Sequence, residues 1–345
     1  MTDETRAIAL SGELQMRAED PQLPAILAHA SNTTKEKIAE FFFANIRNPN
    51  TRRAYQRQVK QFLVWYDERF GLTDLNEIRP LHVAAYIEEE TKQHEAQTVK
   101  QQLAAIRMLF DWLVVRQEIP MNPASAVRGP RYSVKKGKTP VLSRAEAKFL
   151  LDSIQVATTS ENGTVGAPLV VGLRDRALIA LMVYTFARVG AVLKMEVRDY
   201  YPSGGNGEHW LVRLKEKSGK DHEVPVHHTA GEYLDAYLDA SGIREEPQSP
   251  LFRTTRGRSG RLTERGLQER EALAMIKRRA TAAGMQVPGI CCHTFRATGI
   301  TAYLENGGTV ENAQQIAAHE SPMTTKRYDR RSDSISPGEI ERIQL

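Results

Sequence analysis

Three stretches of the chain carry arginine, histidine and tyrosine side chains whose types suit chemistry on a phosphate ester. Arg188 follows an apolar run, and Arg296 lies three residues after His293. His319 precedes Tyr328 by nine residues. Arginine offers paired donors that match phosphate geometry and stays charged at any cellular pH, while histidine and tyrosine can transfer protons or act as nucleophiles. The set therefore suits attack on an anionic phosphorus, where preorganised cations stabilise the developing charge.

A fourth stretch carries lysines. Residues 215–226 contain a Ser-Gly pair between two strand-like runs, which predicts a tight β-hairpin. Lys215, Lys217 and Lys220 all lie on or beside this turn. Each of the three is within reach of a shared site. We favour Lys217, which directly precedes the Ser-Gly pair, as the lysine that takes part in the chemistry.

Each of these residues has an ordinary structural interpretation when it is taken alone. Arg188 could stabilise the C-terminal end of its helix, and His293 with Arg296 could be a surface pair. Tyr328 could pack with its ring buried and its hydroxyl bonded, His319 could be a satisfied histidine, and turn lysines are commonly solvated. The functional interpretation depends on all of them occurring together, in order and at compatible separations.

The elements that must position these residues are helices and a small sheet. A capping box, Ser143 to Glu146, opens the second half of the chain. A long apolar helix is expected over about 173–188, helices dominate again from Glu232 onward, and the spacing of His293 and Arg296 places both on one helix face. Three runs between these helices are strand-like and are separated by turns rich in Gly and Ser: 194–200, 210–215 and 222–226.

The first half of the chain predicts a separate helical domain. Asn48-Pro49 supplies a cap residue and a proline at the first helical position. Apolar residues then recur at helical spacing from Tyr55 to Tyr66, and further helices are expected at about 80–91 and after Thr98. Four short amphipathic helices of this kind are enough for an independent domain.

These elements divide the chain into five parts. Residues 1–33 form an acidic N-terminal extension, 34–128 the helical domain and 129–140 a linker rich in proline, glycine and bases. Residues 141–330 form a second domain, and 331–345 are a C-terminal tail. The expected fold is mainly α: an all-α domain joined to a mostly helical α+β domain with a small antiparallel sheet.

Positive charge is concentrated in two parts of the chain. The 345 residues include 47 Lys and Arg against 42 Asp and Glu, a net charge of +5. Residues 100–140 hold eight bases and two acids, and residues 251–280 hold nine bases and three acids. Two such clusters could close around a duplex and release counterions from its phosphates, although a single charged run is more often a solvated helix face. The candidate DNA contacts are Arg52, Arg53, Arg57, Lys100, Arg107, Arg128, Arg131, Lys135, Lys136, Lys220, Arg256 and Arg258.

Composition and motifs argue against several other classes. The N-terminus is acidic and unlike a secretory signal, and the longest apolar stretch, 177–187, is too short to cross a bilayer. We therefore expect no membrane association. The two cysteines are neighbours, and neighbouring cysteines rarely form a strain-free disulfide, so we expect a reducing cytoplasm. His227-His228 and Cys291-Cys292-His293 look ligand-like, but adjacent side chains converge poorly on one ion. With no Walker-type glycine loop either, we expect no metal and no other cofactor.

The ordered set of residues resembles the tyrosine recombinase, or phage integrase, family. That family's pattern is an arginine after a helix, a β-hairpin lysine, His-x-x-Arg, a second histidine, and a tyrosine nine residues beyond it within Thr-Thr-x-x-Tyr. The resemblance extends over about 171–330. The first domain is also similar to the family's core-binding domain, especially at 50–55, at 62–65 and at Asn122-Pro123.

The resemblance implies a role for each residue and the fold of the DNA breaking-rejoining enzymes. Tyr328 would be the nucleophile that forms a covalent 3′-phosphotyrosine, and Lys217 would protonate the departing 5′ oxygen. His293 would act as an acid–base group or orient the nucleophile, and His319 would hydrogen-bond the phosphate held by the two arginines. Neither metal nor ATP would be needed.

The same resemblance implies the partners. Double-stranded DNA would be the substrate, and a homotetramer would bridge two duplexes, the free protein being a monomer or a dimer. The tail 331–345 could dock on a neighbouring protomer, and accessory proteins could take part. The protein would be cytoplasmic and nucleoid-associated, with integration, resolution and transposition equally open as its role.

Two positions depart from the family pattern. An acid often lies three residues after the first arginine, where this chain has Ala191, so another residue must hold Arg188. Ala317-Ala318 stands where Leu-Gly usually precedes the histidine. Two alternative functions also stay open: a catalytically inactive DNA-binding accessory protein on the same fold, and a single-strand-nicking, topoisomerase-like enzyme.

Overall fold

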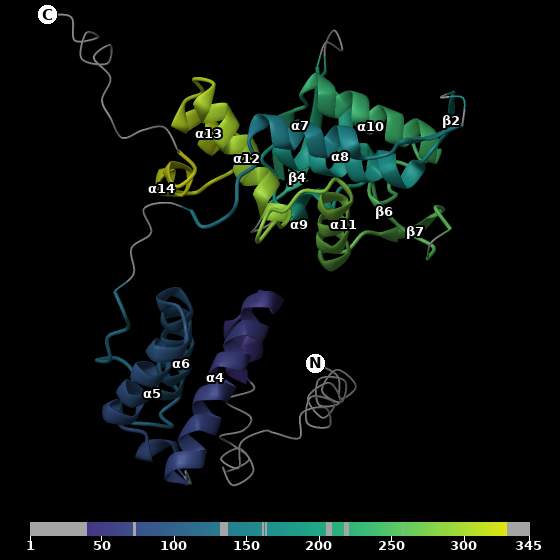
Figure 1. The fold of residues 1–345 in the computed structure, drawn as a ribbon. Helices are drawn as coiled ribbons and strands as arrows, with labels where there is room; N and C mark the ends of the chain where they lie inside the picture. Colours follow the sequence, from purple (N-terminus) through teal and green to yellow (C-terminus); the bar gives the residue numbers. More distant parts are fainter. Residues whose placement is uncertain are drawn as a thin grey trace, which may run out of the picture. The chain divides into compact units, whose positions relative to one another are not determined.

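The computed structural model divides the chain into two compact units, Met1–Ser133 and Val134–Leu345, which are described separately (Figure 1). It describes residues 40–71, 74–131, 137–160, 162, 164–204, 209–216, 221–257 and 259–329. The linker predicted over 129–140 spans the division between the units. The predicted extension 1–33 and the predicted tail 331–345 lie outside the described residues.

The first unit is built from helices whose ends are set by local sequence. Asn48 caps α4 (Pro49–Phe70) because its side chain accepts hydrogen bonds from the backbone of the first turn, and a proline follows at the first helical position. Gly71, with a φ of 60°, ends the helix in the left-handed conformation. The other helices are η1, a π-helix (Phe41–Asn45), the 3₁₀ helix η2 (Leu75–Glu77), α5 (Pro80–Gln93) and α6 (Ala96–Val115).

An aromatic core holds this unit together. The ring of Phe62 on α4 lies edge-on to Tyr86 of α5 and to Phe110 of α6, with centroids 5.2 and 6.2 Å apart. All three side chains are buried, and so are Val83 and Ile106 beside them. The apolar faces predicted from helical spacing therefore meet in one core, with polar faces left at the surface.

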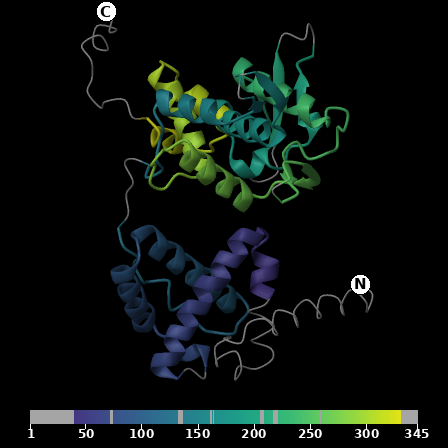
Figure 2. The ribbon, with the colours of Figure 1, turned by 45° about the vertical axis from the view of Figure 1, so that its right-hand side comes forward.

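The second unit is organised around one buried helix, α8 (Val170–Tyr184). Every residue from Ala177 to Met182 is buried, because α8 packs against α10 (His228–Ser241) and α12 (Cys292–Glu305) (Figure 1, Figure 2). A helix that is apolar on all sides is stable only when it is covered on all sides. The remaining helices are α7 (Arg144–Ser153), α9 (Val189–Val192), α11 (Glu269–Ala282), α13 (Val310–Ile316) and α14 (Pro322–Lys326).

Three small antiparallel sheets complete the second unit. The largest has the order β3 (Tyr200–Pro202), β4 (Trp210–Lys215) and β5 (Asp221–Pro225), with Val212 opposite Val224 and Lys215 opposite Asp221. Val212, Leu214 and Val224 are buried, so this hairpin has one face in the core. The other two sheets are β1 (Ala157–Thr159) with β2 (Val165–Pro168), and β6 (Arg253–Thr255) with β7 (Leu262–Gly266).

The structure corrects three local predictions. The helix expected over 173–188 ends at Tyr184, because the chain turns through Phe186 with a φ of 54° and Arg188 becomes the residue before α9. Most of the strand expected over 194–200 is a turn and the short 3₁₀ helix η3 (Val197–Asp199), which begins with a capping box between Glu196 and Asp199, and the strand β3 starts only at Tyr200. The hairpin β6–β7 interrupts the region expected to be helical after Glu232.

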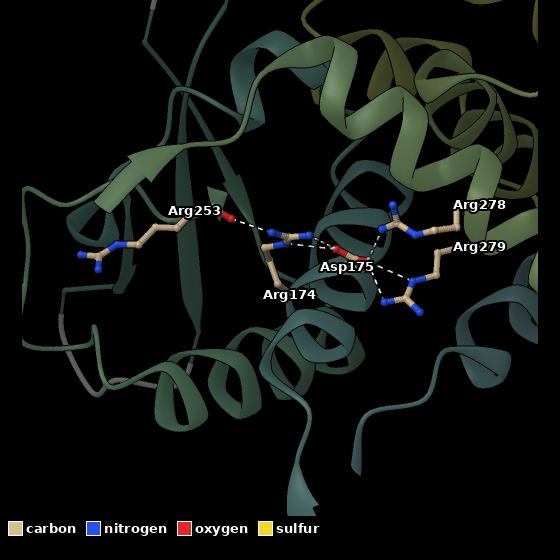
Figure 3. Close-up of polar contacts among 5 residues, drawn as sticks. All are labelled: Arg174, Asp175, Arg253, Arg278 and Arg279. Atoms are coloured by element: carbon tan, nitrogen blue, oxygen red, sulfur yellow. Dashed lines mark hydrogen bonds and ion pairs between the residues drawn. The ribbon is translucent and has the colours of Figure 1, made fainter. Parts of the chain in front are cut away.

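A buried ionic cluster connects α8, α11 and β6 (Figure 3). Asp175 on α8 is fully buried, and its two oxygens accept hydrogen bonds from Arg174 at 2.6 and 3.0 Å and from Arg279 on α11 at 2.9 Å. Arg174 also donates to the carbonyl of Arg253 at 2.7 Å, and Arg278 lies 3.7 Å from the same carboxylate. A buried carboxylate requires such partners. The cluster thus sets the position of α11, which precedes α12 in the chain.

A glycine allows α12 to lie against the end of α8. A Cβ at Gly299 would be 2.0 Å from the carbonyl oxygen of Val183 and 2.8 Å from the ring of Phe186, so only glycine fits here. The close approach places Arg296, one turn earlier on α12, beside the chain that leaves α8.

Candidate active site

Arg188 lies at the start of α9 and contacts a carboxylate from the β4–β5 hairpin. Its Nη1 forms an ion pair and hydrogen bond with Oε2 of Glu216, the residue that follows β4. The Glu216 side chain is 6% exposed and that of Arg188 is 38% exposed. Since Ala191 has no carboxylate, Glu216 is the acid that holds Arg188 in this chain. Sequence reasoning missed Glu216, because no sequence pattern pairs two residues so far apart.

Arg296 is fully buried on α12 and is held by two backbone carbonyls. Its Nη1 donates to the carbonyl of Phe186, and its Nη2 donates to that of Ala317 at 2.6 Å. Its Nε is buried and has no hydrogen-bond partner among the residues that the structure describes. Burial and then the nearby Arg188 lower the pKa of Arg296 to about 10, so the group stays charged at neutral pH. A buried cationic donor without a partner is suited to receive an anion.

Tyr328 and His293 are in direct contact. His293 Nε2 lies 2.6 Å from the phenolic oxygen of Tyr328. Burial, followed by the charges of Arg296 and Arg188, lowers the pKa of His293 below its usual 6.5. The imidazole is therefore neutral at pH 7 and can accept the phenolic proton. Burial raises the pKa of Tyr328, although the same two arginines oppose this effect, so the phenol keeps its proton until a base removes it.

His319 is buried beside Tyr328. Its ring lies parallel to that of Tyr328, with centroids 5.9 Å apart, and its Nδ1 lies 2.9 Å from Oγ1 of Thr325. Burial and then the charges of Arg296 and Arg188 lower the pKa of His319 to about 3. The ring is therefore neutral, and the Thr325 contact leaves Nε2 as the nitrogen for a further hydrogen bond.

The segment that carries Tyr328 is held by its own chain. Ser321 caps the short helix α14, and the backbone N–H of Tyr328 donates to Thr325 at 2.9 Å. From α12, the hydroxyl of Thr301 donates to the carbonyl of Tyr328 at 3.1 Å. Tyr328 also packs against an apolar cluster that includes Phe186, Ile300 and Leu304. Tyr328 is thus held where the charges of Arg296 and Arg188 of the same protomer act on it.

The hairpin that carries the candidate lysines is anchored near this site. Nε2 of His222 on β5 lies 3.1 Å from the carbonyl of Ile316, at the end of α13. Lys215 is exposed at the end of β4. Lys217 and Lys220 lie outside the described residues, so the choice among the three lysines stays a prediction.

The candidate DNA contacts of the first unit differ from one another in exposure and in hydrogen-bond partners. Arg53, Arg57, Lys100, Arg128 and Arg131 are exposed, and Arg53 donates to Asn50 at 2.6 Å. The other two arginines of the first unit are half-buried and bind backbone carbonyls: Arg52 donates to Ile46 at 3.0 Å, and Arg107 donates to Ala124 at 3.0 Å and to Val127.

In the second unit, Arg256 is exposed in the β6–β7 turn. Lys135, Lys136, Lys220 and Arg258 lie outside the described residues. The geometry of the described residues does not assign a phosphate to any of these side chains, so their contacts with DNA stay predictions.

The described ranges contain neither a cluster of metal-ligating side chains nor a helix that could span a membrane. Within them, no group of three or more His, Cys, Asp and Glu side chains is arranged to hold a metal ion. Cys291 and Cys292 are free thiols at the start of α12, and burial raises the pKa of Cys292 to about 11. His227 stacks on Tyr184 with ring centroids 4.2 Å apart. None of the described helices is both long and apolar enough to span a bilayer.

Two family descriptions match the chain. The description "Phage integrase family" matches residues 164–334, and "Phage integrase, N-terminal SAM-like domain" matches residues 42–117. The first match contains Arg188, His293, Arg296, His319 and Tyr328, the side chains that the fold brings together. The chain belongs to the phage integrase family, the tyrosine recombinases. The predicted family and enzyme class are therefore confirmed.

Curated members of the tyrosine recombinase family cover most of the chain. Tyrosine recombinase XerD of Listeria monocytogenes serotype 4b (strain F2365) is 26% identical over 286 residues, 81% of this chain and 87% of that protein. Tyrosine recombinase XerC of Myxococcus xanthus is 26% identical over 306 residues, 86% of this chain and 93% of that protein.

Solved structures of tyrosine recombinases share the fold. A lambda integrase dimer bound to a COC′ core site has a TM-score of 0.62 at 19% identity and covers 96% of this chain and 90% of that one. The XerH site-specific recombinase in a post-cleavage complex with palindromic difH has a TM-score of 0.61 at 19% identity, covering 80% of this chain and 75% of that one. The predicted fold class is confirmed.

Proposed function

We propose that this protein is a site-specific DNA recombinase that cuts and rejoins strands through a covalent 3′-phosphotyrosine on Tyr328. The observation that carries the proposal is the 2.6 Å contact between Tyr328 and the neutral His293, beside two arginines. A nucleophile, a base and preorganised cations meet at one place, as phosphoryl transfer requires. An inactive accessory protein would have no need for this arrangement.

The proposed cleavage step is a displacement at phosphorus. The phenolic oxygen of Tyr328 attacks the scissile phosphate while its proton passes to Nε2 of His293. The bond from phosphorus to the 5′ oxygen breaks, and that oxygen leaves with a proton, for which Lys217 is our favoured donor. A 5′ hydroxyl from a partner duplex then attacks the phosphotyrosine and releases Tyr328. The number of phosphoester bonds is unchanged, so the cycle needs no ATP, and its charges are balanced without a metal.

The buried donors stabilise the charge that develops on the phosphate. Arg296 offers its unpartnered Nε, Arg188 offers the part of its guanidinium not used by Glu216, and His319 offers Nε2. Donors that are fixed before the reaction do not have to reorganise when the charge appears, which makes such stabilisation a large part of catalysis.

The remaining assignments concern the two units and their partners. We assign DNA binding through exposed bases to the helical unit and cleavage to the second unit, with the tail 331–345 as a docking segment for a neighbouring protomer. A lambda integrase has been solved as a tetramer bound to a Holliday junction. A homotetramer on two duplexes, formed from free monomers or dimers, is the assembly that we infer here, with accessory proteins left to experiment. A cytoplasmic, nucleoid-associated location belongs to the same proposal.

The first prediction tests the covalent intermediate. Genomic DNA of the encoding organism is fragmented, randomly nicked and incubated with the protein, so that cleavage beside a nick releases the strand end and traps the adduct. Denaturant-resistant protein–DNA adducts are recovered, and their DNA is sequenced. We expect adducts at a recurring sequence, with phosphate on Tyr328, and an unchanged yield when a divalent-metal chelator is added.

Tyr328→Phe should bind the recovered duplex with native affinity and form no adduct. Tyr303→Phe is the matched control, because Tyr303 packs against the same apolar cluster and should leave the adduct yield unchanged. An adduct on another residue, no adduct on a bound duplex, or strict metal dependence would contradict the proposal.

A further inference from the structure

We propose that Glu216 is the positioning residue for Arg188, so that the β4–β5 hairpin, rather than α9, sets where the first guanidinium meets the scissile phosphate. The inference rests on the proposed function and deepens it, because it assigns a role to a residue outside the expected set. Its starting point is the absence of an acidic side chain near Arg188 on its own helix: Ala191, on the same turn as Arg188, offers no carboxylate.

The contact between Glu216 and Arg188 differs from a surface ion pair, because its carboxylate is buried. Glu216 is almost completely buried, and its carboxylate accepts from Nη1 of Arg188. A buried carboxylate without a partner is costly, so the pair holds both side chains in one arrangement. The Arg188 side chain is 38% exposed. Glu216 engages Nη1, so the remaining donors of the guanidinium are available to bind a phosphate.

Glu216 also makes it easier for two cations to share the site. Arg188 lowers the pKa of Arg296, because two nearby guanidinium charges repel each other. Glu216 opposes this effect and raises the pKa of Arg296. The carboxylate therefore keeps both guanidinium groups close together in the absence of DNA, before the phosphate supplies negative charge of its own.

The hairpin is rigid enough to act as a support. Val212 and Leu214 fix β4 in the core, and the register brings Lys215 opposite Asp221. On β5, His222 contacts the carbonyl of Ile316, next to the Ala317 carbonyl that accepts from Arg296. The hairpin is thus connected to both arginine positions, through Glu216 directly after β4 and through His222 on β5.

The test uses single-turnover cleavage of the nicked duplex recovered by adduct sequencing. Glu216→Ala should lower the cleavage rate constant about 10²-fold, the usual cost of a small misplacement of a reacting group. Glu216→Gln, which keeps the shape of the side chain, should cause a smaller loss. Glu216→Asp should recover most of the native rate, because it keeps the charge. The affinity for DNA and the unfolding temperature should stay at native values for Gln and Asp.

Glu223→Gln is the matched control. Glu223 lies on the same hairpin, is exposed, and pairs with Tyr201 and Arg213 away from the site. Its replacement should leave the cleavage rate unchanged. Native rates for both Glu216→Gln and Glu216→Ala would overturn the proposal. So would an equal loss in Glu223→Gln, because a general disturbance of the hairpin would then account for the effect.

A second substrate separates action through Arg188 from action through the neighbouring Lys217. In this duplex, the bridging 5′ oxygen at the cleavage position is replaced by sulfur, which leaves without needing a proton donor. If Glu216 acts through Arg188, the defect of Glu216→Gln persists on the sulfur substrate. If the defect disappears, Glu216 serves leaving-group protonation, and the proposal is wrong. Failure of the native protein to form any adduct would instead contradict the proposed function, so the two failures are distinguishable.

Discussion

The proposed proton transfer from Tyr328 depends on a histidine that is uncharged at neutral pH. His293 is close enough to accept the phenolic proton, and burial together with two arginines keeps it neutral at pH 7. The same arginines favour the phenolate that would form on Tyr328. The arginine charges therefore keep His293 neutral and favour the anionic form of Tyr328, whereas burial opposes ionisation of the phenol.

The second prediction concerns pH. The rate constant for adduct formation at limiting protein reports ionisations of the free protein. Because His293 must be neutral and its pKa lies below 6.5, the rate should be constant near pH 7 and fall only as the pH drops below 6.5. His293→Gln should be slower and should lose this acid limb. His228→Gln, which alters an exposed histidine outside the site, should keep it; an acid limb that survives in His293→Gln would rule out His293 as the base.

The third prediction concerns backbone strain next to His319. Ala318 has a φ of 46°, a left-handed conformation that disfavours any side chain with a Cβ. Ala318→Gly should therefore raise the free energy of unfolding by about 0.5–1 kcal/mol, after the greater freedom of glycine in the unfolded chain is subtracted. Chemical denaturation measures the change. Ala317→Gly is the control, because Ala317 has a φ of −78° and is buried, so this change should destabilise the protein.

At the scale of elements, the contact between α8 and α12 determines where Arg296 lies. The carbonyl of Phe186 can accept from Arg296 only because Gly299 lets α12 approach the end of α8. The buried Asp175 cluster then connects α8 to α11, the helix before α12. Arg296 is thus placed by packing between α8 and α12, helices that are separated in the sequence by more than a hundred residues.

The fourth prediction tests this packing. Gly299→Ala should destabilise the protein by about 1–3 kcal/mol, the usual cost of overpacking, and should lower adduct formation because Arg296 is displaced. Thermal unfolding and adduct yield measure the two effects. Gly231→Ala is the matched control: a Cβ there would lie 3.4 Å from Tyr200, an ordinary contact, so this helical glycine should be replaced with a gain of about 0.5–1 kcal/mol. Equal effects of the two substitutions would contradict the packing argument.

At the scale of the whole molecule, each unit has its own hydrophobic core. The core of the first unit lies between Phe41 and Val127, and the cores of the second unit lie between Leu142 and Ala317. Domains with separate cores can fold separately. The proposed catalytic side chains that the structure describes all belong to the second unit, whereas many of the exposed candidate DNA contacts belong to the first.

The fifth prediction follows from this division. A chain cut between Arg131 and Gly137 should give two fragments that each unfold cooperatively, as measured by circular dichroism during heating. The second fragment should bind the recovered duplex at least about 10-fold more weakly than the full chain, with a smaller salt dependence, because it has lost bases that neutralise phosphates. A fragment that is unfolded on its own, or a second fragment with native affinity, would contradict the prediction.

Local sequence determined the features that depend on neighbours in the chain. Asn48-Pro49 and the Ser143 capping box mark helix starts that the structure contains, and the spacing of His293 and Arg296 places both on α12. The order and spacing of the site residues also determined the family, which the comparisons confirm. These inferences succeed because capping, helical periodicity and motif spacing operate within a few residues.

Tertiary structure alone decided what holds the site residues in place. Glu216 supports Arg188, the carbonyls of Phe186 and Ala317 hold Arg296, and none of these contacts follows a local pattern. The end of α8 at Tyr184, in place of the expected Arg188, has the same origin, since the left-handed Phe186 is set by packing against α12. A carboxylate or a carbonyl becomes a partner only when folding removes water from around it and brings a distant donor within reach. That event depends on the packing of whole helices and strands, and residue spacing does not predict it.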